Sequence, residues 1–178
     1  MKTVLILSGS PRKGGNSDLL CDAFMRGAQE AGHQVEKIRI ASKRINYCLG
    51  CYHCRENNGQ CAIQDDMIEI LDKMLRADVL VLASPVYFYS VNAQMKALID
   101  RTVARWLEFD GKEFYYIMSA AEDTDTVMDT TLACFRGFAD CLNNSHERGV
   151  IYGKGAYEKG EIIGTVAMEQ AYEMGKTV

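Results

Sequence analysis

Short apolar runs that alternate with amphipathic segments constrain the fold of this chain more than any other feature. The centres of residues 3–8 and 78–83 are consecutive apolar residues, which is typical of parallel strands that are covered on both faces. Three further strand-like segments lie at 34–40, 113–119 and 145–152. Because helical patterns separate these five segments, the sequence predicts an α/β fold with a doubly wound, five-stranded parallel sheet.

The expected helices span 17–31, 92–107, 125–143 and 160–175, and another helix begins at Asp65 or Asp66. The pattern of that last helix is the most regular, because its apolar residues match the i, i+3, i+4, i+7, i+8 stripe in full. These residues are Met67, Ile70, Leu71, Met74 and Leu75. Since no repeat, low-complexity segment or linker interrupts the order, residues 1–178 are predicted to form one domain, with a cysteine-rich insertion loop at 45–64.

Composition excludes several classes of partner. The formal net charge is -4 and no basic block is present, which argues against nucleic-acid binding. The first apolar run is too short for a membrane span or a signal-peptide core. The seven cysteines are typical of a reducing compartment, so we expect a cytoplasmic protein whose clustered thiols serve as metal ligands or redox groups.

A loop rich in glycine and serine joins the first strand to the first helix and is a candidate anion site. Such a loop allows the backbone to approach a phosphate, and the helix directs unpaired N–H groups and its positive dipole end toward it. Ser10, Asn16 and Ser17 add short donors, and Arg12 adds a permanent charge. The glycine spacing fits neither a dinucleotide nor a nucleoside-triphosphate loop, which favours a monophosphate. The alternative is a glycine-rich turn that caps the helix through Asn16 or Ser17.

An aromatic loop follows the strand at 78–83. Residues 84–90 read Ser-Pro-Val-Tyr-Phe-Tyr-Ser, and ligands of open α/β sheets bind at the carboxyl ends of the strands. We therefore expect these aromatic side chains to face a ligand. The alternative is aromatic packing at a helix start or at a subunit contact.

Four of the cysteines lie in a compact block with intervals of two, two and six residues: Cys48, Cys51, Cys54 and Cys61. Three closely spaced thiolates and a more distant fourth can hold a [4Fe–4S] cluster, as in ferredoxin-type runs. A tetrahedral zinc site and metal-free thiols with one reversible disulfide remain as alternatives. Cys21, Cys134 and Cys141 fall on expected helices and are interpreted as buried small hydrophobes.

Three motifs in this order resemble those of a known family. They are Gly9-Ser10-Pro11-Arg12 through Asn16-Ser17, then Ser84-Pro85-Val86-Tyr87 with Lys96 and Asp100-Arg101 downstream, and the cysteine block that ends in Asp65-Asp66-Met67. The chain resembles the flavodoxin-like NADPH-dependent FMN reductases and, more narrowly, the iron–sulfur flavoproteins. The resemblance implies a strand order of 2-1-3-4-5 with FMN at the topological switch point.

The resemblance also implies roles for individual residues. The FMN phosphate would be held by Ser10, Arg12, Asn16 and Ser17. The isoalloxazine ring would be lined by Pro85, Val86, Tyr87 and Phe88 and approached by Ser119 and Ala120. A [4Fe–4S] cluster would be ligated by Cys48, Cys51, Cys54 and Cys61. Asp100 and Arg101 are expected to form or support a structural ion pair, and Lys96 to pair with Asp100 along the helix.

The implied function is an FMN-dependent oxidoreductase that passes electrons from NAD(P)H to a quinone, a flavin or another small acceptor. The flavin would supply the chemistry, in agreement with the wide separation of His33, His53 and His146, which suggests no catalytic triad. One alternative is an iron–sulfur electron carrier with ferredoxin as the donor. A non-redox module that binds a partner protein is a further alternative. We expect a homodimer or homotetramer that binds neither nucleic acid nor membrane.

Overall fold

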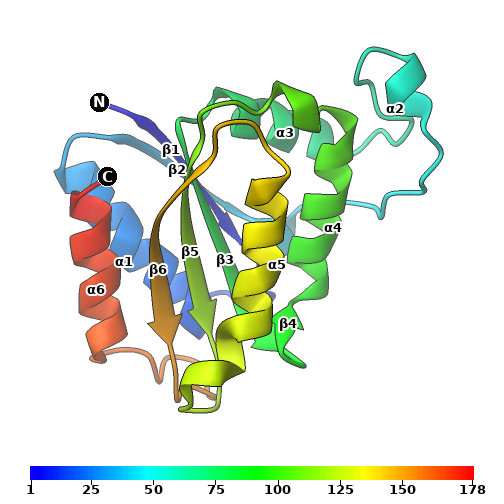
Figure 1. The fold of residues 1–178 in the computed structure, drawn as a ribbon. Coiled ribbons are helices and arrows are strands. Elements are labelled where there is room, and N and C mark those ends of the chain that lie inside the picture. Colours follow the sequence, from blue (N-terminus) through cyan, green and yellow to red (C-terminus); the bar gives the residue numbers. More distant parts are fainter.

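A computed structural model of the chain describes the backbone of residues 1–178 and the side chains of all of them except residue 125. Its centre is a parallel sheet with the order β2-β1-β3-β5-β6 (Figure 1). The strands are β1 (Thr3–Ser8), β2 (Gln34–Arg39), β3 (Val79–Tyr87), β5 (Glu113–Ser119) and β6 (His146–Gly153). The predicted order 2-1-3-4-5 is confirmed; a short β4 (Ser90–Val91), antiparallel to the end of β3, is added to it.

Helices cover both faces of this sheet. The two helices on one face are α1 (Asn16–Glu30) and α6 (Val166–Lys176), and those on the other are α3 (Met67–Arg76), α4 (Ala93–Arg101) and α5 (Asp129–Asp140) (Figure 1). The short α2 (His53–Glu56) lies in the cysteine-rich loop, which projects from the body of the molecule. The fold is thus a flavodoxin-like three-layer sandwich.

Alternation along the strands explains their continuous apolar runs. In β1, Leu5 and Leu7 belong to the core beneath α3, α4 and α5, whereas Val4 and Ile6 belong to the core beneath α1 and α6. Successive side chains of a strand point to opposite faces. Since both faces of this sheet are covered, both sets of side chains must be apolar.

Two glycines allow α1 and α6 to pack closely. A Cβ atom at Gly27 would lie 2.1 Å from the carbonyl oxygen of Tyr172, and one at Gly175 would lie 2.1 Å from that of Phe24. No side chain fits at such distances. This contact fixes α6, and with it the end of the loop that follows β6, against the first helix.

Several predicted boundaries were wrong. The helix expected at 92–107 ends at Arg101 and continues as the 3-10 turns η2 (Thr102–Ala104) and η3 (Trp106–Glu108). The Thr102 hydroxyl donates to the carbonyl of Ile99 at 2.7 Å, a local bond that competes with helix continuation.

Residues 160–165 are not helical as expected, because Gly160 and Gly164 take positive φ values and α6 begins only at Val166. Similarly, the 3-10 turn η4 (Asp125–Met128) precedes α5. Of the three cysteines expected to be buried, Cys21 is buried, Cys134 is half-buried and Cys141 is exposed. Among the helices that the structure describes, none has the length and apolar character needed to cross a bilayer.

Candidate functional site

The loops after β1 and β3 meet at the carboxyl edge of the sheet, where the chain direction of the crossovers changes. Together with the ends of β5 and β6 they enclose a cavity of about 150 Å³. Its lining is Ser10, Arg12, Gly15, Asn16, Ser17, Pro85, Val86, Tyr87, Ser119, Ala120, Ala121, Ala156 and Tyr157. Nine of the ten residues predicted to bind FMN therefore surround one cavity, and Phe88 lies outside it.

The loop between β1 and α1 is held by its own backbone. The Gly9 N–H donates to the carbonyl of Ala83 at 2.8 Å, and the Gly15 N–H donates to that of Arg12 at 3.0 Å. Ser10 closes the turn, because its hydroxyl accepts from the Arg12 N–H at 3.2 Å. A Cβ atom at Gly15 would lie 2.8 Å from the Ser10 hydroxyl. We call residues 8–17 the phosphate loop.

Ser17 is the clearest sign of an absent ligand in this loop. Its hydroxyl is buried in the first turn of α1 and has no hydrogen-bond partner among the residues that the structure describes. Buried polar atoms are nearly always paired, and the first N–H groups of a helix also have no acceptor within the helix. An anion at this position would satisfy both.

Arg12 and Asn16 face the loop between β6 and α6 instead. Arg12 is exposed and donates to the carbonyl of Tyr157 at 3.1 Å. The Asn16 amide donates to the carbonyls of Ala156 and Glu158 and accepts from the Gly160 N–H at 3.0 Å. In this structure Asn16 therefore holds a wall of the cavity, and its backbone N–H is the group left for an anion.

A buried carboxylate beneath the phosphate loop was missed by sequence reasoning. Asp18 accepts from the Ser8 hydroxyl at 2.9 Å, from the Gly14 N–H at 2.9 Å and from the Lys37 ammonium at 3.1 Å. Burial by itself raises the pKa of Asp18, but these bonds outweigh it, and the net shift is downward. Asp18 thus stays charged and fixes the left-handed turn at Gly14.

Asn92 was also missed, although it joins the two loops of the site. This buried side chain donates to the carbonyl of Gly9 in the phosphate loop, and its oxygen accepts from the Ser84 hydroxyl at 3.1 Å. The Asn92 N–H donates back to Ser84 at 3.0 Å. Asn92 therefore bridges the phosphate loop and β3, in addition to the backbone bond from Gly9 to Ala83.

The aromatic segment forms a hairpin rather than the expected loop. Pro85, Val86 and Tyr87 continue β3, and the turn to β4 is made by Phe88 and Tyr89 at φ values of +50° and +59°. Such values are uncommon for bulky residues and occur at functional sites. Phe88 is fully exposed and lies on a neighbouring cavity of about 200 Å³.

The third wall comes from the far end of the sheet. Ser119 ends β5, and the Ala120 N–H donates to the carbonyl of Gly153 at 2.9 Å. The Ala156 N–H in turn donates to the carbonyl of Ala120 at 2.9 Å. The loop after β6 therefore contributes Ala156 and Tyr157, which were predicted to lie before a helix and were given no role.

The cysteine-rich loop is a second site, distinct from this cavity. Its four predicted ligands, Cys48, Cys51, Cys54 and Cys61, all line one cavity of about 760 Å³. They are free thiols, two of them exposed and two half-buried. Among the side chains that the structure describes, no three or more His, Cys, Asp or Glu residues converge on a position that would hold a metal ion.

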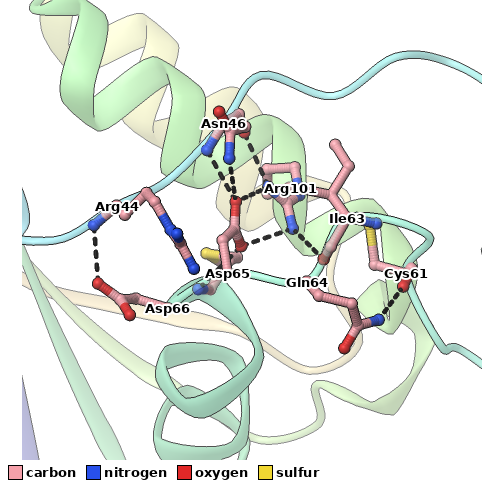
Figure 2. A network of polar contacts seen from close by, with 9 residues as sticks. Arg44, Asn46, Cys61, Ile63, Gln64, Asp65, Asp66 and Arg101 are labelled. Atoms are coloured by element: carbon pink, nitrogen blue, oxygen red, sulfur yellow. Dashed lines mark hydrogen bonds and ion pairs between the residues drawn. The ribbon is translucent and has the colours of Figure 1, made fainter.

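The base of this loop is tied by a buried ion pair (Figure 2). Arg101 on α4 donates to both carboxylate oxygens of Asp65, at 2.8 and 3.0 Å. The predicted pairing of Arg101 in a structural ion pair is thus confirmed with Asp65 as its partner, while Asp100 pairs with Lys96 at 2.6 Å. Burial by itself raises the pKa of Asp65, but the bonds from Arg101 and Asn46 outweigh it and lower that pKa to about 2.

Comparison with known proteins places the chain. The profile of the NADPH-dependent FMN reductase family matches residues 1–132. The chain belongs to this family. It is a family of oxidoreductases.

The relatives of this chain include iron–sulfur flavoproteins. One from Archaeoglobus fulgidus is 48% identical over 101 residues, which are 57% of this chain and 45% of that protein. One from Methanocaldococcus jannaschii is 48% identical over 99 residues, 56% of this chain and 51% of that protein. The match thus spans about half the length of these relatives. A solved azoreductase from Bacillus anthracis shares the fold, with a TM-score of 0.77, 15% identity and full coverage of both chains.

The residues present fit FMN. The orphan Ser17 hydroxyl, the N-terminus of α1 and the glycine cradle suit a phosphate, and the adjoining wall of Pro85, Val86 and Tyr87 suits a planar ring. In the cysteine-rich loop, four thiols line one cavity, and thiolates are the ligands that iron–sulfur clusters take. To ligate one cluster, the four thiols would have to move together. Such movement is common, because metal binding is often coupled to the folding of the segment that carries the ligands.

Proposed function

We propose that this chain is an FMN-dependent oxidoreductase that transfers electrons from NAD(P)H to a quinone, a flavin or another small acceptor. The observation that carries the proposal is the buried Ser17 hydroxyl without a partner at the N-terminus of α1, beside the β3 wall at the switch point. Membership of the FMN reductase family supports it. When bound, FMN would supply two-electron chemistry by accepting a hydride from the nicotinamide and passing the electrons on.

In this proposal the residues of the chain bind and orient the cofactor. Ser10, Ser17 and the first N–H groups of α1 would hold the phosphate, and Arg12 would turn from Tyr157 to add its charge. Pro85, Val86 and Tyr87 would support one edge of the ring, and Ser119 with Ala120 would approach it from β5. Asn92 would keep the phosphate loop and the ring wall at a fixed separation.

The hairpin between β3 and β4 would form the outer rim of the proposed flavin site. Phe88 and Tyr89 form the outer tip of the hairpin, and the Tyr89 hydroxyl lies 3.2 Å from a carboxylate oxygen of Glu122. This contact joins the turn between β3 and β4 to the loop after β5, and both residues line the neighbouring cavity of about 200 Å³. A nicotinamide or an acceptor would reach the ring beside this bridge.

The test is a cofactor and turnover measurement on the purified chain. We expect a flavin absorbance spectrum or stoichiometric FMN uptake, and loss of the oxidised-flavin band when NADPH or NADH is added without oxygen. Addition of a quinone should restore the band. A protein that neither retains nor binds FMN would overturn the proposal.

A second function is favoured by the cysteine loop, in which four thiols line one cavity, and by the iron–sulfur flavoproteins among the relatives. In this alternative the chain is an electron carrier that holds a [4Fe–4S] cluster on Cys48, Cys51, Cys54 and Cys61 and receives electrons from a ferredoxin. Iron and acid-labile sulfide are measured on anaerobically prepared protein. About four irons per chain would support the carrier, and zinc or no metal would leave the simple FMN reductase.

Assembly is the remaining part of the proposal. We propose a homodimer or homotetramer, since exposed apolar side chains gather near the cysteine loop, among them Leu49, Tyr52, Val103 and Leu107. Such patches mark association surfaces. Sedimentation of the FMN-loaded protein would test this, and a monomer at micromolar concentration would contradict it.

A further inference from the structure

The Arg101–Asp65 pair is buried more deeply than packing alone explains. The side chain of Arg101 is 2% exposed and that of Asp65 is 0% exposed. Removing two charges from water is costly, and a pair of apolar residues often fills such a position equally well. The other groups that these two charged side chains bind therefore indicate what the pair does.

The guanidinium also binds both ends of the cysteine-rich loop (Figure 2). It donates to the carbonyl of Asn46 at 2.8 Å and to that of Ile63 at 3.4 Å. Asp65 completes the tie, because it accepts from the Asn46 N–H at 2.8 Å and from the Asn46 amide at 3.1 Å. We call this cluster of Asn46, Ile63, Asp65 and Arg101 the neck of the loop.

The neck places the first and last thiols of the loop. Cys48 lies two residues after Asn46, and Cys61 lies two residues before Ile63. Two residues of extended chain span at most about 7 Å. The neck therefore limits the distance of Cys48 from Asn46 and of Cys61 from Ile63 to about 7 Å each, without any metal.

Arg101 also has a donor to spare on this side. Its Nε–H is buried and has no hydrogen-bond partner among the described residues, and Arg101 and Cys61 line the same two cavities. A guanidinium keeps its charge in proteins, so a permanent cation lies beside the cavity that Cys61 lines.

We infer that Arg101 and Asp65 are positioning residues for a four-thiol iron–sulfur site: they close the neck in advance and leave the Arg101 Nε–H as a donor for the Cys61 sulfur. This inference rests on the iron–sulfur alternative of the proposed function. Closing a loop beforehand removes part of the ordering cost of binding. Hydrogen bonds to ligand sulfurs also set the reduction potential of a cluster.

The first experiment tests the neck in metal-free protein. A short bifunctional maleimide is added to full-length chain, and the Cys48–Cys61 cross-link is measured by peptide mass spectrometry. We expect it to be a main product in the wild type and to fall at least about tenfold in Arg101→Met, because the effective concentration of the two thiols drops when the neck opens. Lys96→Met, which removes an exposed charge from the same helix, is the matched control and should cross-link as the wild type does.

The second experiment tests the cluster. After anaerobic reconstitution with ferrous iron and sulfide, Arg101→Met should bind iron about 10- to 100-fold more weakly, as is typical when partners of metal ligands are removed. Arg101→Lys keeps the positive charge but loses the planar set of guanidinium N–H donors. This variant should retain iron, and its cluster should have a more negative midpoint potential and an altered electron paramagnetic resonance spectrum. A merely structural role would leave the potential unchanged.

Each outcome decides a separate claim. The double variant Asp65→Asn with Arg101→Met leaves no unpaired buried charge, so it is used if Arg101→Met does not fold, and FMN uptake verifies folding in every variant. Equal cross-linking in the folded double variant and the wild type would overturn the inference. Wild-type protein that takes up no iron would overturn the iron–sulfur alternative, and with it the role of the neck in cluster binding.

Discussion

The phosphate loop and the cysteine-rich loop prepare for ligands in opposite ways. Residues 8–17 are tied at Gly9, Ser10, Gly14 and Gly15 by bonds within the loop or to the buried framework. Residues 46–63 are tied to the body mainly at the neck, and the bonds of the tip, such as Gly59 N–H to the Cys54 carbonyl at 2.9 Å, are local. The first loop has a complete set of internal bonds, and the second is closed at the neck, while its thiols do not converge among the residues that the structure describes.

This difference agrees with the chemistry of the two proposed ligands. A phosphate is recognised by N–H groups that the helix already directs outward, so the cradle can be complete before binding. An iron–sulfur cluster is held by coordination bonds from thiolates, and metal binding is commonly coupled to the folding of the loop that carries these thiolates. The following predictions set the two regions against each other, from the largest expected effect to the smallest.

Arg101→Met should cause the largest loss of stability. It leaves the Asp65 carboxylate buried without its partner, which costs about 3–5 kcal/mol, whereas the double variant with Asp65→Asn should recover most of this loss. Denaturant unfolding of the two variants and the wild type measures the difference. If the single and double variants are equally stable, the neck is not held by a paired charge.

Asn92→Ala should weaken the phosphate loop. It removes the side-chain donor to the buried Gly9 carbonyl, at a cost of about 1–3 kcal/mol, and it should reduce FMN affinity as well. Asn57→Ala in the cysteine-rich loop is the control, because its bond to the His53 carbonyl is exposed and its loss should stay within about 0.5 kcal/mol. Equal losses of unfolding free energy would contradict the distinction between the two loops.

Acid should weaken the ion pair at the neck of the cysteine-rich loop. The folded-state pKa of Asp65 is about 2, below the ordinary value of 3.8, so the pair stabilises the protein above pH 4 and this contribution is lost as the pH falls from about 4 to 2. The shift corresponds to about 2 kcal/mol. Unfolding free energies of the wild type and Asp65→Asn, measured across this range, should converge at low pH. A constant gap between them would contradict the assignment.

Ser17→Ala should separate stability from binding. The hydroxyl has no partner among the described residues, so its removal should leave the FMN-free protein as stable as the wild type or slightly more stable. FMN should bind roughly 3- to 10-fold more weakly, which corresponds to about 0.5–1.5 kcal/mol for one hydrogen bond. Fluorescence titration and thermal unfolding together measure both effects. Unchanged affinity would remove Ser17 from the phosphate site.

Local patterns made the strands, the helices and the position of the two loops predictable, whereas the strand order and the FMN residues were implied by the family resemblance. Strand runs and helical stripes are written in neighbouring residues, and the switch-point rule then places the loops after β1 and β3 side by side. The limits appear where a contact joins distant residues. Asn92 and Gly9 are 83 positions apart, and Arg101 binds Asn46 from 55 positions away, so no local pattern announces either bond.

Phe88 shows a second kind of limit. The family resemblance implied that it lines the flavin ring, but the chain reverses there with a left-handed backbone at Phe88 and Tyr89, and Phe88 lies outside the cavity. Glycine or asparagine usually occupies such turn positions, and neither residue type occurs at position 88 or 89. Asn16 likewise has the residue type expected of a phosphate ligand, yet its side chain is used by the loop after β6.

The affinity of the FMN-free protein for FMN, compared with riboflavin, tests the central claim most directly. The two ligands share the isoalloxazine ring and differ in the phosphate that the phosphate loop is proposed to hold. We predict that FMN binds at least about 100-fold more tightly, or about 2.8 kcal/mol, and that Arg12→Ala narrows this gap without unfolding the protein. Equal affinities for FMN and riboflavin would contradict the assignment of residues 8–17 as the phosphate site.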